Sequence, residues 1–248
     1  MAGTISPPAG IDPAPWDGLL KKYVNTQGLV AYGQWKANTA DMRQLDDFVA
    51  AYGESDGPAA SGPEEIAALI NAYNAFTIRW ILQNYPTESI RELDSSWDKA
   101  RWNIGGRIVS LDEIENKNLR PLYGWRVHAT IVCAARSCPP LLAEAYTAAN
   151  LEALTARAYH VWLAREDLNQ LDEAARVARV SPIFKWFKSD FTGEGELAIL
   201  LEKYAPARHR VFLTGRRYRT EYLDYYWGLN DQGSRGRDYS PSIFKRLF

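Results

Sequence analysis

The stretch PEEIAALINAYNAFTIRWILQNY, from Pro63 to Tyr85, decides the fold. A proline and two glutamates stand at its start, where a first helical turn accepts a missing N–H and favours negative charge. Apolar side chains then cover so much of the circumference that we expect a central helix packed on several sides. Asn71 and Asn74 lie within this apolar surface, so each amide needs hydrogen-bond partners if it is buried.

Weaker patterns on both sides of this helix predict shorter elements. Helical periodicity is found over residues 16–25, 39–53, 148–165 and 195–205, and Ser110 is a suitable N-cap for another helix. We expect a hairpin at Gly105-Gly106, a strand in RVHATIVCA and a strand before a short helix in VARVSPIFKWFKSDF. GLVAYGQWKA is interpreted as extended, and residues 208–231 as a terminal extended pair.

Helices outnumber strands in this pattern, which predicts an α+β fold with helices packed around a small, mostly antiparallel sheet. We expect one domain over residues 16–231. An extended arm rich in Pro and Gly precedes it over residues 1–15, and a tail follows over residues 232–248.

The composition excludes several classes of function. A net charge of −1 over 248 residues gives no reason to expect nucleic acid as a partner. No apolar run approaches the roughly 20 residues that span a bilayer, so no integral membrane segment is expected. The opening MAGTISPPAGIDPAPW has neither the basic nor the apolar region of an export signal. Phosphate-binding, dinucleotide and metalloprotease motifs are absent, and we expect no cofactor. The sequence does not indicate an oligomeric state.

The segment VHATIVCAARSCPPLL, from Val127 to Leu142, holds both cysteines and one of three histidines. A cysteine reacts as its thiolate, which a neighbouring base or positive charge stabilises. On a strand, His128 and Cys133 would point to opposite faces. Cys138 follows in a loop fixed by two prolines, and such a loop can fold back to the face that carries His128.

Other interpretations of this segment stay open. Cys133 fits a small core residue and Cys138 a buried loop thiol. The His-x4-Cys-x4-Cys spacing lacks the C-x2-C pair common in zinc sites, so no metal is expected. A Cys133–Cys138 disulfide would close a small loop and stabilise little. Glu115, on the helix before this segment, fits either a solvated surface acid or a carboxylate that orients His128.

Five stretches together resemble family 547 of the domains of unknown function, in particular its bacterial members. They are INAYNAFTIRWILQNYP, SLDEIENKNLR, RVHATIVCAARSCPPLLAEAYTA, SPIFKWFKSDF and YLDYYWGLND. The family's His, Cys-x4-Cys-Pro-Pro and Ile-Glu elements fall on His128, Cys133, Cys138 and Glu115. This set is similar to the Cys, His and acid sets of papain-like and transglutaminase-like folds, by analogy only. Where the family commonly has a histidine after Ile-Glu, this chain has Asn116.

The resemblance has two further implications. Bacterial members often carry an export signal, which implies a periplasmic or secreted protein whose signal has been removed, with a cytoplasmic protein as the alternative. In an oxidising location the disulfide interpretation gains weight. Polar residues gathered in apolar settings also imply a site, which favours a role for the cysteines in chemistry.

We therefore expect a thiol-dependent hydrolase or acyl transferase that acts on an amide or peptide-like substrate. Cys138 would attack, His128 would accept its proton and Glu115 would orient the imidazole, with Cys133 as the reserve nucleophile. The residues assigned to substrate binding are Asn71, Tyr73, Asn74 and Arg136. The alternative is a non-catalytic module that binds a peptide or small molecule and has structural cysteines.

Overall fold

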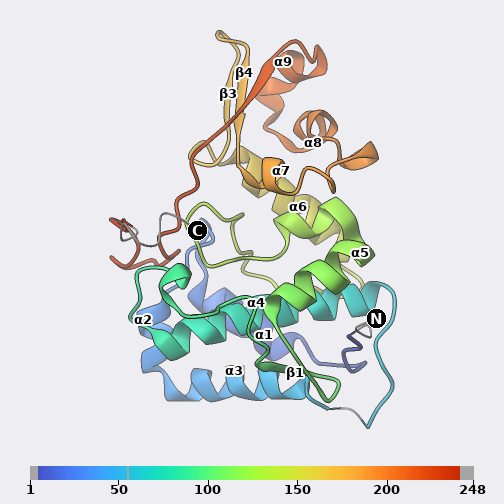
Figure 1. The fold of residues 1–248 in the computed structure, drawn as a ribbon, viewed down its shortest axis with the longest axis vertical. Coiled ribbons are helices and arrows are strands. Elements are labelled where there is room, and N and C mark those ends of the chain that lie inside the picture. Colours follow the sequence, from blue (N-terminus) through green and yellow to red (C-terminus); the bar gives the residue numbers. More distant parts are fainter. Residues whose placement is uncertain (1–4, 55, 241–248) are drawn as a thin grey trace.

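The computed structural model describes residues 5–54 and 56–240, and Figure 1 shows its arrangement. Its longer helices are α1 (Ala14–Tyr23), α2 (Tyr32–Ala37), α3 (Thr39–Ala51), α4 (Pro63–Asn84), α6 (Leu151–Ala164) and α8 (Leu197–Tyr204). Short helices are α5 (Arg120–Tyr123), α7 (Ile183–Trp186) and α9 (Arg210–Thr214). The 3₁₀-helices are η1 (Ile90–Glu92), η3 (Gly124–Ala129), η4 (Gly193–Gly195) and η5 (Ala207–His209), and η2 (Glu113–Leu119) is a π-helix. The strands are β1 (Trp102–Ile104), β2 (Arg107–Val109), β3 (Gln170–Asp172), β4 (Val177–Val180) and β5 (Arg219–Tyr222).

The helix α4 is the centre of the lower half of the molecule in Figure 1. It packs against α2, α3 and η2, and its middle is buried around the whole circumference. Burial of this many large apolar side chains supplies the main driving force for folding, at about 1.5–3 kcal/mol for each. The central helix expected from the sequence is confirmed.

The strands form two small sheets. β1 and β2 pair as an antiparallel hairpin whose turn residues, Gly105 and Gly106, both have positive φ, as the predicted hairpin requires. At the opposite end of the molecule, β3 pairs antiparallel with β4, and β4 pairs parallel with β5. The α+β class and the single domain are confirmed.

Two segments outside the cysteine region differ from the expected structure. Residues 32–37 form helix α2 rather than an extended piece, because Tyr32 and Trp35, three residues apart, share the buried face of one helical turn. Residues 208–231 do not form an extended pair. They contain α9, and the one strand among them, β5, finds its partner in β4, far away in the sequence.

Both ends of the chain return to the core as far as the structure describes them. Ile5, in the expected arm, is buried and its N–H donates to Asn118. After β5 the chain descends to the lower half, where the backbone of Arg136 donates to Gly228 and residues 30 and 231 form a bridge. The outer parts of the expected arm and tail, residues 1–4 and 241–248, lie outside the described residues.

Candidate active site

The loop that carries both cysteines is held by a side chain of the central helix. The Asn74 amide donates to the carbonyl of Thr130 at 2.8 Å and accepts from the N–H of Val132 at 2.9 Å. The predicted strand in RVHATIVCA is wrong, because η3 occupies its first half and the buried Asn74 amide takes the hydrogen bonds of the second half that a strand partner would make. Cys133 thereby follows directly from a backbone segment that is anchored to α4.

The two thiols lie next to each other. The Sγ atoms of Cys133 and Cys138 are 2.9 Å apart, both cysteines are free, and the N–H of Cys133 donates to the Cys138 sulfur at 2.9 Å. The hydroxyl of Tyr225 lies 3.1 Å from the Cys133 sulfur. Cys138 is buried, whereas Cys133 is only partly buried. Cys133 is therefore the more exposed residue of the pair.

The surroundings of the two thiols shift their pKa values in opposite directions. Hydrogen bonds from Cys138, Tyr225 and the backbone of Ala135 stabilise the thiolate of Cys133 and lower its pKa against the effect of burial. Burial, followed by the neighbouring Cys133 sulfur, raises the pKa of Cys138 well above its ordinary value. The pair thus holds one proton on Cys138 more readily than on Cys133.

His128 is fixed by an acid that the sequence did not identify. Its Nε2 lies 2.8 Å from Oδ2 of Asp190, and the guanidinium of Arg120 binds both oxygens of that carboxylate at 2.6 and 2.8 Å. The imidazole packs against Phe187 and Phe191 and its side chain is 2% exposed. Because a carboxylate only accepts, Nε2 carries the proton and Nδ1 is the ring nitrogen without a partner among the described residues.

Burial lowers the pKa of His128, and Arg120 lowers the pKa of Asp190. Desolvation lowers the pKa of His128 to about 4, more than the hydrogen bond to Asp190 raises it. The hydrogen bond from Arg120 lowers the pKa of Asp190 to about 2. His128 is therefore a neutral imidazole near pH 7, and Arg120 is the charge that balances Asp190.

Glu115 was expected to orient His128, but its carboxylate binds Tyr73 instead. It accepts a hydrogen bond from the Tyr73 hydroxyl at 3.0 Å, and burial raises the pKa of its carboxyl. It lies on the π-helix η2, which packs against α4 and so directs Glu115 to a tyrosine of that helix. The position of orienting acid, next to the imidazole, is taken by Asp190 instead.

A cavity of about 230 Å³ brings the predicted chemical groups together. His128, Cys133, Cys138, Glu115 and Tyr73 line it, and its other lining residues are Trp97, Asp112, Asn116, Ile131, Pro139, Ile183, Trp186, Phe187, Tyr225 and Trp227. Five residues chosen from the sequence therefore share one cavity.

Three of the residues assigned to substrate binding do not line this cavity. The Asn71 amide donates to the carbonyl of Tyr146 at 2.7 Å and accepts from the N–H of Tyr146 at 3.0 Å. Asn74 binds the cysteine loop in the same way. Arg136 points to the C-terminal segment and donates to the carbonyl of Asp231 at 2.7 Å. In this structure all three side chains bind backbone groups of the protein itself.

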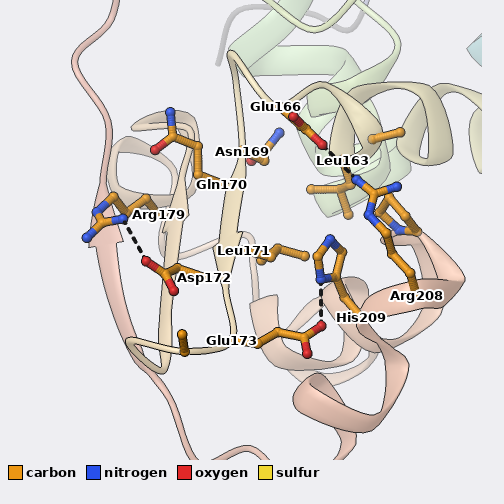
Figure 2. Close-up of a pocket in the computed structure, with 13 residues that line it drawn as sticks. Leu163, Glu166, Asn169, Gln170, Leu171, Asp172, Glu173, Arg179, Arg208 and His209 are labelled. Atoms are coloured by element: carbon orange, nitrogen blue, oxygen red, sulfur yellow. Dashed lines mark hydrogen bonds and ion pairs between the residues drawn. The ribbon is translucent and has the colours of Figure 1, made fainter.

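A larger cavity lies elsewhere, between α6, the β3–β4 hairpin and η5, and measures about 520 Å³. Figure 2 shows its charged side chains turned toward one another: Arg208 pairs with Glu166 and His209 with Glu173. Asn169, which is buried there, has its hydrogen bonds satisfied by backbone groups. Because these charged side chains are paired with one another, we place the candidate site at the thiol pair.

The sequence reasoning missed Asp190, Arg120 and Tyr225 as site residues. Asp190 and Tyr225 stand 62 and 92 residues from the groups they contact. The signal that could have found them is the resemblance itself, since Asp190 lies in SPIFKWFKSDF and Tyr225 in YLDYYWGLND.

Neither a membrane helix nor a metal cluster is found over residues 5–54 and 56–240. No helix there is long and apolar enough to cross a bilayer. No group of three His, Cys, Asp or Glu side chains there is arranged to hold a metal ion.

The fold and site define a single α+β domain whose buried helix anchors a two-cysteine loop at an aromatic cavity. Residues 59–163 match the model of a family described as "Protein of unknown function, DUF547". The match includes α4, η2, η3 and both cysteines, but ends before Asp190 and Tyr225. No curated protein and no solved structure matches the chain.

Proposed function

We propose that the protein is a thiol-dependent hydrolase or acyl transferase that acts on an amide or peptide-like substrate. The observation that carries the proposal is Cys133, a partly buried residue that lines a cavity and whose sulfur is within hydrogen-bond distance of Cys138 and Tyr225. Stabilisation of a thiolate by such donors is how enzymes activate cysteine near neutral pH.

Within this proposal Cys133 is the nucleophile, and Cys138 is its hydrogen-bond donor. The buried Cys138 thiol keeps its proton because burial disfavours its thiolate. Its sulfur lies 2.9 Å from that of Cys133, so it can donate to the charge that forms on Cys133. This assignment exchanges the roles that the sequence suggested for the two cysteines.

His128 is the proton carrier, and Asp190 is its positioning residue. The neutral imidazole presents Nδ1 as an acceptor while Nε2 stays on Asp190. Arg120 keeps Asp190 ionised, so the carboxylate can stabilise the imidazolium that forms when His128 accepts a proton.

The proposed reaction has two steps. The proton of the Cys133 thiol goes to His128, and the sulfur attacks the acyl carbon to form a tetrahedral intermediate. The C–N bond then breaks, the amine leaves with the proton from His128, and a thioester remains on Cys133. Water, or an acceptor amine in a transferase, then attacks the thioester carbon and gives a proton to His128. The C–S bond breaks, the carboxylic acid or the new amide is released, and the proton returns from His128 to the sulfur of Cys133.

Trapping of the acyl-enzyme tests this proposal. The wild-type protein is mixed with an aryl acetate at neutral pH, quenched in acid, and the acetylated residue is located by mass spectrometry. We expect acetylation of Cys133, its loss in Cys133→Ser, and a rate about 100-fold lower in His128→Asn. His160→Asn is the matched control, because His160 lies on α6 and binds the backbone of Tyr204. Acetylation that survives Cys133→Ser would contradict the assignment.

The aromatic lining of the cavity favours a second candidate, a binding module with structural cysteines. Trp97, Trp186 and Trp227 line the cavity, and such rings serve ligand binding as well as they serve a reaction. If the wild-type protein forms no acyl-enzyme at either cysteine, this candidate replaces the first. Substitution of a cysteine should then lower stability and leave ligand affinity unchanged.

We also propose a periplasmic or secreted location, with a cytoplasmic location as the alternative. The support is the resemblance to bacterial family members that carry export signals. Fractionation of the native cells, followed by detection with an antibody, tests it. Recovery with the periplasm or medium supports the proposal, and recovery with the cytosol contradicts it.

A further inference from the structure

The ionisable carboxyl groups that line the thiol cavity are not matched by a positive side chain in its lining. Asp112 and Glu115 line it, and among residues 5–54 and 56–240 no lysine or arginine does. The cation behind the site, Arg120, is engaged by Asp190 and by the side chain of Asn116 at 2.6 Å. An anionic group that entered the cavity would therefore meet two carboxyl groups and no opposing positive side chain on the walls.

One wall of the cavity is a cluster of four rings, Trp97, Trp186, Tyr225 and Trp227, which we call the aromatic wall. Trp186 and Trp227 are nearly parallel with centroids 6.2 Å apart, and Tyr225 lies 4.9 and 4.7 Å from them. Trp97 meets Trp227 edge-on at 5.9 Å. Trp186 remains 50% exposed although it lines the cavity, so its ring is available for contact with a ligand.

Two observations connect this wall with positive charge. The guanidinium of Arg91, which is not a lining residue, lies 5.3 Å from the centroid of Trp227, so one ring already holds a cation. The backbone N–H of Asp112 donates to the carbonyl of Trp97 at 3.0 Å, which fixes a carboxyl-bearing residue beside the wall. Faces of Trp and Tyr rings combined with a carboxylate are the chemistry that recognises ammonium groups.

We propose that the substrate carries a positively charged amine, which packs against the aromatic wall near Asp112 while its acyl carbon meets Cys133. This inference rests on the proposed function for the acyl carbon, but the recognition of the amine is a property of the cavity itself. Trp186 and Asp112 are then specificity-determining residues of the site.

A pair of isosteric probes tests the charge alone. One is a chloroacetamide that bears a 2-(trimethylammonio)ethyl group, and the other bears a 3,3-dimethylbutyl group, in which carbon replaces the charged nitrogen. The rate of Cys133 alkylation is measured for each and divided by the rate with free glutathione. We expect the cationic probe to react about fivefold faster than the neutral one. Equal rates, or a faster neutral probe, would overturn the proposal.

Variants locate the recognition. Trp186→Ala and Asp112→Asn should each lower the preference for the cationic probe, and Trp186→Phe should keep part of it. Asp47→Asn removes the same charge from α3, outside the cavity, and should leave the preference unchanged. If Asp47→Asn lowers the preference as much as Asp112→Asn does, the preference reflects net charge and the proposal fails.

A binding measurement separates this proposal from the proposed reaction. The corresponding unreactive acetamides are titrated into the Cys133→Ala variant, and binding is followed by tryptophan fluorescence. Tighter binding of the cationic acetamide supports amine recognition even if wild-type Cys133 forms no acyl-enzyme. Equal affinities would contradict amine recognition even if the acyl-enzyme is trapped.

Discussion

At the scale of single residues, the buried imidazole of His128 couples the site to the stability of the fold. Its pKa is about 4 in the folded protein and 6.5 in a solvated chain. Between these values the unfolded chain binds more protons than the folded one, so stability decreases as pH falls from 6.5 to 4. Asp190, with its pKa at about 2, adds a further loss as pH falls from about 4 to 2.

Replacement of His128 by Gln should remove the loss of stability between pH 6.5 and 4. The difference in the His128 pKa corresponds to about 3 kcal/mol, at about 1.4 kcal/mol per unit. We expect the wild-type free energy of unfolding to decrease by about that amount from pH 7 to 4, and the variant to show a flatter profile. Urea unfolding at a series of pH values measures both, and parallel profiles would contradict the expectation.

The sequence located the chemical groups better than their partners. Cysteine and histidine are rare here and carry chemistry by type, so His128, Cys133 and Cys138 could be selected without a structure. Glu115 was a reasonable orienting acid by its position on a neighbouring helix. The direction of its side chain, however, depends on the π-helical turn and on α4, which no local pattern reveals.

At the scale of elements, two asparagines of α4 make the same pair of hydrogen bonds to different segments. Asn74 holds the loop before Cys133, and Asn71 holds the backbone of Tyr146. The sequence correctly required partners for both amides. The strand prediction failed because a buried segment bound by a side chain has the same apolar and β-branched content as a strand.

Substitution of these asparagines by alanine should separate stability from site geometry. Each variant leaves a buried N–H and a buried carbonyl unpaired, which costs about 2–4 kcal/mol. We expect similar losses in the free energy of urea unfolding for Asn74→Ala and Asn71→Ala. Only Asn74→Ala should shift the pH profile of Cys133 alkylation, since only that loop leads to the cysteine. A shift of equal size in Asn71→Ala would show that Asn74 has no specific role.

At the scale of the whole molecule, the site closes only when distant parts of the chain meet. Tyr225 and Trp227 come from the segment after β5, which returns from the upper sheet to the cysteine loop. The sequence predicted the α+β class and the central helix. It could not predict this return, because β5 pairs with β4 in parallel and the register is set by tertiary contacts.

Tyr225→Phe tests whether the segment after β5 activates the Cys133 thiol. Loss of the hydroxyl removes one donor to the Cys133 sulfur, so we expect the pKa of Cys133 to rise and its alkylation at pH 7 to slow severalfold. Tyr226→Phe is the neighbouring control, because the Tyr226 hydroxyl donates to the carbonyl of Arg237 instead. Identical alkylation rates in the two variants would contradict a role for Tyr225.

We propose Cys133, supported by Cys138, as the activated thiol. Its most direct test is the rate of iodoacetamide alkylation of each cysteine in the reduced, folded protein from pH 5 to 9, with the modified residue located by mass spectrometry. We expect Cys133 to react first, with a midpoint below the ordinary thiol pKa of about 8.5, and this midpoint to rise in Cys138→Ala. Faster reaction of Cys138, or an ordinary midpoint for Cys133, would contradict the claim.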